Sequence, residues 1–217
     1  MKNHAGNLAL LLLCIFIPLF MLSAIRPHDY FTWFMEVFPT IIVVAILVPT
    51  YRRFRLTNLV YLAIFIHALI LIRGGHYTYA EEPIFNWLRD TFAMKRNYYD
   101  RLGHFAQGFV PALVAREIIS RTSPVKKNGW LFFLTFCVCM TITSLYELLE
   151  WQTAVWTGTA ADAFLGTQGD VWDTQWDMAL CLLGALTALI TLSRFHSKKI
   201  AELTTPAVED KTREDVL

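Results

Sequence analysis

The residues best suited to chemistry are acidic side chains that crowd one stretch of an otherwise apolar chain. From Trp151 to Asp177 the sequence contains no Lys or Arg, although several Asp residues lie within it. Glu147 and Glu150 come just before this stretch, at the end of a long apolar run. Carboxylates are costly close to a membrane, so several together indicate a binding or catalytic site. The Asp residues are Asp162, Asp170, Asp173 and Asp177.

If the surrounding segments are helical, the spacing of these carboxylates pairs them on common faces. Glu147 and Glu150 would be neighbours at i,i+3, and Asp173 and Asp177 would be neighbours at i,i+4. Like charges this close repel one another, so they need a proton, a cation or an Arg between them. Because oxygen ligands suit hard cations, we predict that these four residues bind a divalent cation such as Mg²⁺ or Mn²⁺.

A histidine adds a candidate for proton transfer. Asp100 and His104 are four residues apart and therefore share a helical face. His104 would act as a base or as a softer metal ligand, and the predicted catalytic residues are His104, Asp100 and Glu147. Structural explanations stay open: Asp residues at a helix start complement its dipole, Asp100 and His104 could form a structural pair, and the Glu residues could mark a helix end in water.

Long apolar helices would have to position these residues. Hydrophobic residues make up 55% of the 217-residue chain, and the mean hydropathy is +0.42. That apolar share is larger than a soluble domain carries. Crossing the hydrocarbon core takes about 20 apolar residues in a helix. The stretches that approach this length are, roughly, Leu8–Ala24, Tyr30–Pro49, Asn58–Ile72, Gly103–Ile119, Gly129–Leu149 and Met178–Leu192.

The basic residues predict how these spans are oriented. The short loops near Arg52 and Lys126 and the region around Lys198 are basic, whereas the segment 151–177 has no basic residue. Basic loops stay on the cytoplasmic side. We therefore predict an all-α, polytopic transmembrane helix bundle of about six spans, with both termini cytoplasmic and the acidic residues facing outward. The net charge of +1 gives no reason to expect a nucleic-acid partner.

Two further segments complete the predicted single domain. Residues 1–196 would form the bundle, with an amphipathic helix near 83–96 that lies along the membrane surface. Pro83 suits the first turn of that helix, and apolar residues recur after it at helical spacing. Residues 197–217 are charged and lack apolar periodicity, so we expect a flexible cytoplasmic tail.

Other polar residues fall at the same predicted depth as the acidic cluster. Glu36 and His67 belong to the outer halves of their spans, although Glu36 could instead pair with Arg73, and His67 could simply be a packing residue. Arg101 and Arg73 would be available to bind a phosphate group. The two glycines in the run LGTQGD at 165–170 are typical of turns.

Three blocks of sequence carry a resemblance to a known family. They are YDRLGH at 99–104, YELLEW at 146–151 and LGTQGDVWDTQWDM at 165–178. At these residues the chain resembles the YjdF family of bacterial inner-membrane proteins. A fainter similarity connects it to VanZ-like membrane proteins, which place an Asp and a His at the start of one helix and a Glu at the end of the next. The resemblance implies a multi-pass protein of the bacterial inner (plasma) membrane and no particular reaction.

Three functions fit this pattern. The first is an enzyme that performs metal-assisted chemistry on a lipid-linked or phosphorylated substrate at the outer leaflet. The second is a scaffold or assembly factor that docks a membrane-protein partner at the acidic pocket. The third is a small cation- or proton-coupled transporter, which is less favoured because the inner halves of the predicted spans carry almost no ionisable residues. The bilayer itself is the expected partner in every case, and no motif fixes the reaction type.

Overall fold

The computed structural model describes residues 4–126, 129–158 and 162–205, and over these residues the chain forms helices and loops without strands. The predicted all-α class is confirmed. One short 3-10 helix, η1 (Tyr79–Glu81), accompanies the α-helices. These are α1 (His4–Ser23), α2 (Tyr30–Thr50), α3 (Asn58–Tyr77), α4 (Pro83–Thr91), α5 (Tyr99–Thr122), α6 (Gly129–Thr157), α7 (Asp162–Leu165) and α8 (Asp173–Thr204).

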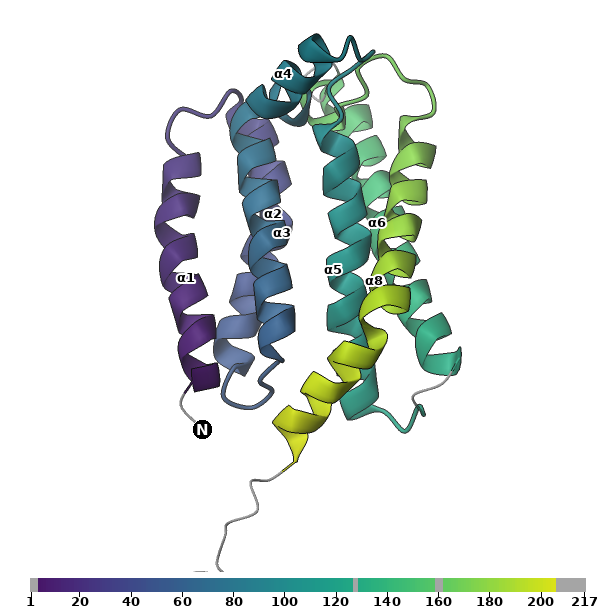
Figure 1. Cartoon of the computed structure of the whole chain (residues 1–217). Helices are drawn as coiled ribbons and strands as arrows, with labels where there is room; N and C mark the ends of the chain where they lie inside the picture. The colour runs from purple at the N-terminus through teal and green to yellow at the C-terminus, as the bar shows by residue number, and fades with distance from the viewer. Residues whose placement is uncertain (1–3, 127–128, 159–161, 206–217) are drawn as a thin grey trace, which may run out of the picture.

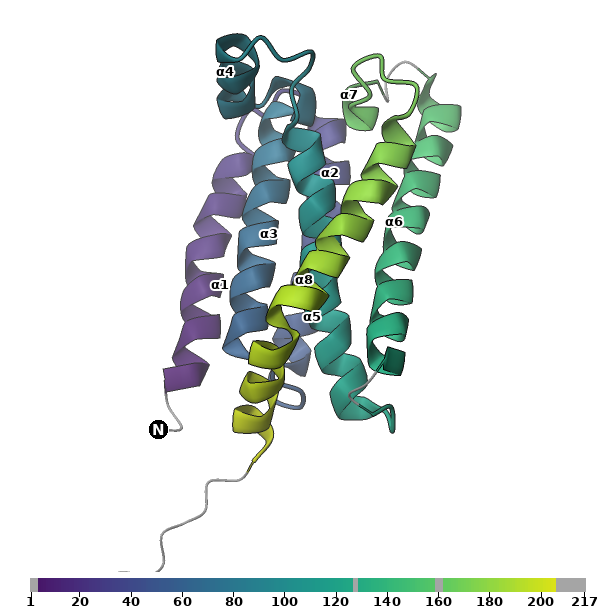
Figure 2. The ribbon, with the colours of Figure 1, turned by 45° about the vertical axis from the view of Figure 1, so that its right-hand side comes forward.

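The long helices differ in how apolar they are. α2, α3, α6 and α8 are long and apolar enough to cross a membrane, and Leu8–Ser23 in α1 is a shorter apolar helix. α5 carries Asp100, Arg116 and Glu117, yet it lies in the middle of the bundle beside α8 (Figures 1 and 2). The most polar long helix is therefore surrounded by apolar helices, as expected where charged groups must be kept away from lipid.

α5 and α8 cross so closely that only glycine fits at two of their contacts. A Cβ on Gly108 would lie 1.8 Å from the carbonyl oxygen of Cys181, and a Cβ on Gly184 would lie 2.0 Å from that of Phe105. Small residues allow helix backbones to approach in membranes, where close packing drives association. This crossing fixes the register of α5 against α8, and with it the positions of the charged residues on both helices.

Apolar side chains form two cores that share α3. Because α3 contributes to both, it joins α1 and α2 to the rest of the bundle. The first core lies between α3, α5, α6 and α8 and includes Val60, Leu113, Cys139 and Ala188. The second lies between α1, α2 and α3 and includes Phe16, Val37, Ala68 and Ile72.

α4 lies across one end of the bundle (Figure 1), and α7 is found at the same end (Figure 2). We call this the acidic end; it also contains the first turns of α5 and α8. α4 is shorter than the helix predicted near 83–96, because it ends at Thr91 and Ala93 adopts a φ of 49°. That turn directs Arg96 and Asn97 into the bundle, where both side chains are buried.

α8 is longer than predicted and continues to Thr204, past the expected start of the tail at Ser197. The reason is that its last turns still bury side chains: His196 and Ile200 are buried, and Arg116 Nη2 donates a hydrogen bond to Ser197 Oγ at 2.6 Å. The charged residues between these contacts concealed the helical periodicity. The rest of the predicted tail, 206–217, lies outside the described residues.

Candidate active site at the acidic end

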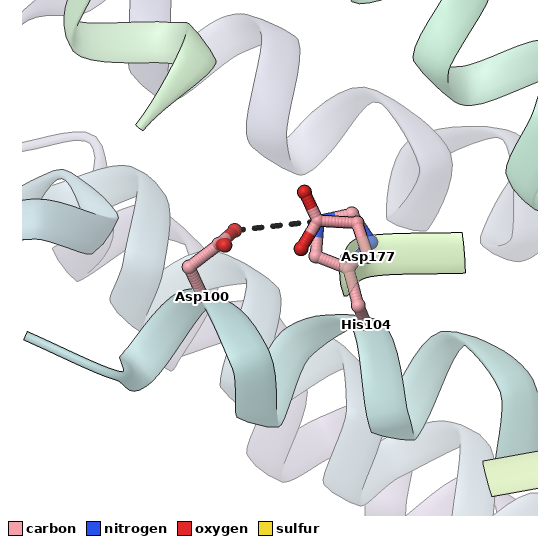
Figure 3. A group of neighbouring side chains, drawn as sticks. All are labelled: Asp100, His104 and Asp177. Atoms are coloured by element: carbon pink, nitrogen blue, oxygen red, sulfur yellow. Dashed lines mark ion pairs between the residues drawn. The ribbon is translucent and has the colours of Figure 1, made fainter. Parts of the chain in front are cut away.

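The start of α5 and the start of α8 bring an imidazole between two carboxylates. His104 Nε2 lies 3.3 Å from Asp100 Oδ1 and 3.6 Å from Asp177 Oδ1. Asp100 and His104 project from adjacent turns of α5 toward Asp177 on α8 (Figure 3). Ligand atoms from these three buried residues all lie within 4.8 Å of one another, which is close enough for one cation to contact all of them.

Two arginines neutralise part of this cluster. The guanidinium of Arg101 forms ion pairs with Asp177, with Asp100 Oδ2 at 3.2 Å and with Asp173 Oδ1 at 2.6 Å. Arg96 Nη1 reaches the same oxygen of Asp173 at 2.7 Å. Of the three ways to relieve repulsion between neighbouring carboxylates, the structure uses an Arg for Asp100, Asp173 and Asp177. Asp173 is not among the residues whose ligand atoms lie within 4.8 Å of one another.

The loop before α8 is tied to the same arginines. Asp170 Oδ2 lies 3.3 Å from Arg101 Nη2, and the carbonyl oxygen of Gly166 accepts a hydrogen bond from Arg96 Nη2 at 3.0 Å. Gly166 and Gly169 have φ values of 60° and 83°, so both are turn residues, as their spacing predicted. The side chain of Asp162, the remaining Asp of this stretch, lies outside the described residues.

Glu147 approaches the cluster from α6 and has only weak partners. Its Oε1 is 3.9 Å from His104 Nδ1, which allows an ion pair but is too far for a hydrogen bond. Thr174 on α8 also interacts with the Glu147 side chain, but neither carboxylate oxygen of Glu147 nor Nδ1 of His104 makes a hydrogen bond of good geometry, although all three atoms are buried. Buried carboxylates are normally hydrogen-bonded or paired. Unsatisfied atoms that face each other indicate that another group belongs between them.

Charge in the cluster is not balanced by the side chains. Glu150 on α6 is also buried and interacts electrostatically with Glu147 and His104. Six carboxylates thus surround two guanidinium groups and one imidazole. An excess of buried negative charge is expensive unless protons or a cation compensate it. The carboxylates are Asp100, Glu147, Glu150, Asp170, Asp173 and Asp177.

The arginines predicted to bind phosphate are already engaged. Arg101 forms the ion pairs above, and Arg73 forms an ion pair with Glu82 at 2.5 Å. Glu36 is buried, but Arg73 is not its partner. It lies instead on the wall of a cavity that also exposes His67 and His104. His67 Nε2 is buried without a hydrogen-bond partner, so His67 belongs to this wall rather than to the cation position.

The cavity has a volume of about 940 Å³ and lies between α1, α2, α3, α5 and α6. Tyr79 closes it at the acidic end. The ring of Tyr79 occupies a notch over Gly74, where a Cβ would lie 1.6 Å from Cε1 of the ring. Burial raises the pKa of Tyr79 well above its usual value. The phenol therefore stays neutral and can serve as a hydrogen-bond donor beside the carboxylates.

A second buried polar cluster, at the opposite end of the bundle, was missed by the sequence analysis. Glu117 on α5 is fully buried and pairs with His196 Nε2 at 3.0 Å and with Arg121 Nη1 at 2.7 Å. The expectation that this half of the bundle carries almost no ionisable residues was therefore wrong. The available signal was Arg116-Glu117, two charges inside a predicted span, which should have been read as a buried polar contact.

Comparisons with known proteins agree with the fold. Residues 8–198 match the family described as "Predicted membrane protein (DUF2238)". Over 178 residues the chain is 52% identical to the inner membrane protein YjdF of Escherichia coli (strain K12), covering 82% of this chain and 85% of that protein. No solved structure matches the chain. The predicted resemblance is confirmed, and the chain belongs to the DUF2238 family of membrane proteins, as a multi-pass protein of the bacterial inner membrane.

Proposed function

We propose that the acidic end is the active site of a membrane-embedded enzyme that uses a divalent cation to act on a lipid-linked or phosphorylated substrate. The observation that carries the proposal is the meeting of Asp100, His104 and Asp177 within 4.8 Å, beside a buried Glu147 whose oxygens make no hydrogen bond of good geometry. A structural salt-bridge network would leave no such group unsatisfied. Excess negative charge in the same place favours a cation.

Each residue has a role in this proposal. Asp100, His104 and Asp177 would hold the cation, which would supply Lewis-acid activation of a phosphoryl group and of water. Glu147 would be the proton acceptor, because its Oε1 lies 3.9 Å from His104 Nδ1 and its oxygens make no hydrogen bond of good geometry. Arg101 positions Asp100 and Asp177 by pairing with both. Glu150 and Asp173, predicted as ligands, lie beside the cation and add negative charge.

The test measures Mn²⁺ binding by the purified full-length protein in detergent. Binding is monitored through the electron paramagnetic resonance signal of Mn²⁺. Wild-type protein should bind one Mn²⁺ per chain, and Asp177→Asn should weaken binding by roughly tenfold to a hundredfold. Asp90→Asn is the matched control, because Asp90 on α4 is an exposed carboxylate that pairs with Arg89 and not with a residue of the cluster. Binding that is absent in the wild type, or equal in Asp177→Asn, would overturn the proposal.

Activity is tested in cells. A deletion strain should accumulate a lipid-extractable phosphorylated compound, detectable by comparing lipid extracts with those of the parent strain. Wild-type protein and Asp90→Asn should restore the parent profile, whereas Glu147→Gln should not. Glu147→Gln keeps the size of the side chain and removes both its negative charge and its capacity to accept a proton, so the assay is run at Mn²⁺ concentrations that saturate the variant. If Glu147→Gln restores the profile completely, Glu147 has no part in the reaction.

A scaffold remains the second candidate, favoured by one observation. Large apolar side chains surround the acidic end at its surface, and Trp156 and Val171 are 77% and 85% exposed. Tryptophans at this depth also anchor helices at a membrane interface without any partner. Site-specific photo-cross-linking from position 156 in cells distinguishes these roles: a single protein adduct favours docking, and lipid adducts favour anchoring.

A further inference from the structure

The cavity follows the membrane-spanning direction rather than one patch of surface. Along α5 its lining residues run from Gly103 to Thr122, and along α2 from Glu36 to Thr50. At 1.5 Å per residue, the stretch of α5 is roughly 28 Å long. The hydrocarbon core of a bilayer is about 30 Å thick, so a single leaflet offers about half of that. The cavity is therefore long enough to pass from one leaflet into the other.

Polarity in the cavity is concentrated at one end. Where it meets the acidic end, its wall includes Glu36, Tyr79, His104 and Tyr146. Between that end and the opposite one, the wall is formed mainly by aliphatic and aromatic side chains, such as Val43 and Val114, with uncharged polar residues such as Thr50 and Thr122 at the far end. A molecule that matches this wall has one polar end and a long apolar body. Ligand pockets in proteins are typically apolar with a few polar groups, and their volumes range up to about 1,000 Å³. The cavity resembles such a pocket in both its composition and its volume.

Some lining residues also face outward toward hydrocarbon. Ile46 on α2, Ile118 on α5 and Ile142 on α6 line the cavity and are 55%, 41% and 39% exposed. These exposed fractions are consistent with an opening of the cavity along α2, α5 and α6. An apolar chain could enter by this route without leaving the bilayer, which avoids the cost of exposing it to water.

We propose that this cavity holds the apolar chain of a single-chain lipid phosphate of the polyprenyl type, with its head at the Asp100–His104–Asp177 cluster. The cavity is longer than the acyl chains of ordinary phospholipids, which occupy one leaflet, so a longer chain fills it better. The inference rests on the proposed function for the phosphate, because the acidic cluster would repel an anionic head without a cation between them. The chain itself is recognised by the cavity wall alone.

Native mass spectrometry of the purified protein with added lipids tests the inference. The probes are a bilayer-length polyprenyl phosphate and dioleoyl phosphatidic acid, which share a phosphomonoester head and differ in chain length. Polyprenyl phosphate should bind wild-type protein roughly tenfold more tightly. Val43→Trp on α2 and Ile142→Trp on α6 fill the cavity from two sides and should each reduce binding by a similar factor. Ile42→Trp, at a neighbouring exposed position outside the cavity, should leave binding unchanged.

Mn²⁺ binding measured on the same variants separates this inference from the proposed function. Both cavity variants should bind Mn²⁺ as the wild type does, which also shows that they are folded. Equal lipid binding in the wild type and in a Mn²⁺-competent cavity variant overturns the lipid inference and leaves the metal site standing. Equal binding of the two probes overturns the assignment of chain length. A third outcome is that Mn²⁺ does not bind, whereas polyprenyl phosphate binds the wild type and not Val43→Trp. In that case the cavity binds the lipid chain, and the proposed metal-dependent function is wrong.

Discussion

α5 carries a buried carboxylate cluster at each end, and the two clusters differ in how completely they are satisfied. At one end, both oxygens of Glu117 accept hydrogen bonds: Oε1 from Thr57 N at 2.9 Å and from Arg121 Nη1 at 2.7 Å, and Oε2 from Thr57 Oγ1 at 2.7 Å. His196 completes this set. At the acidic end, neither oxygen of Glu147 makes a hydrogen bond of good geometry.

This difference separates a structural cluster from a candidate functional one. Glu117 links the loop before α3 to α8, and Arg121 also stacks 3.9 Å from the ring of Phe54. A buried network in which both oxygens of the carboxylate are paired holds elements together, although His196 Nδ1 and Arg116 Nη1 at this end have no hydrogen-bond partner. An unsaturated cluster beside a cavity is destabilising by itself, so it is retained where a ligand or a reaction needs it. The two ends also differ in charge, because carboxylates outnumber basic groups at the acidic end, whereas Glu117 interacts with Arg116, Arg121 and His196.

The largest expected effect on stability is at the end of α5 that contains Glu117. Glu117→Gln should lower the free energy of unfolding by about 3 kcal/mol, because it leaves buried His196 and Arg121 without their common partner. Thermal unfolding in detergent, monitored by circular dichroism, measures this loss. Glu202→Gln, at an exposed carboxylate paired with Lys199, is the control and should leave the unfolding temperature unchanged. A stable Glu117→Gln protein would show that this cluster is not structural.

An intermediate effect on stability is expected at the crossing of α5 and α8, which positions both clusters. Gly108→Ala places a Cβ 1.8 Å from the Cys181 carbonyl oxygen, so α5 and α8 must separate. Overpacking of this kind costs about 1–3 kcal/mol. Because both clusters depend on the α5–α8 register, Gly108→Ala should lower stability and also weaken Mn²⁺ binding. Gly129→Ala, where a Cβ would meet no atom within 4 Å, should change neither measurement. Loss of stability with full Mn²⁺ affinity would mean that the acidic cluster does not need this register.

The contrast between the ends also shows what sequence could and could not predict. The apolar runs predict the helices well, because a lipid environment selects for composition and length. The acidic end was predicted from residue types at helix ends. The ion pairs within the acidic end were not predicted. Arg96 and its partner Asp173, for example, are 77 residues apart, and only the tertiary packing brings them together. The helix bounds were least predictable where a helix ends in polar residues, as α8 does beyond Ser197.

The smallest expected change in stability, and the sharpest comparison, is at Glu147. Glu147→Gln removes a buried carboxylate that makes no hydrogen bond of good geometry, so the unfolding free energy should stay within about 0.5 kcal/mol of wild type or rise. The same substitution should weaken Mn²⁺ binding by roughly tenfold, because it removes negative charge next to the cation position. Thermal unfolding and Mn²⁺ titration on one preparation give both values. At Glu117 the opposite pattern is expected, with stability lost and Mn²⁺ affinity retained in the protein that remains folded. If Glu147→Gln lost stability as Glu117→Gln does, Glu147 would have a structural partner, and the distinction between the two ends of α5 would disappear.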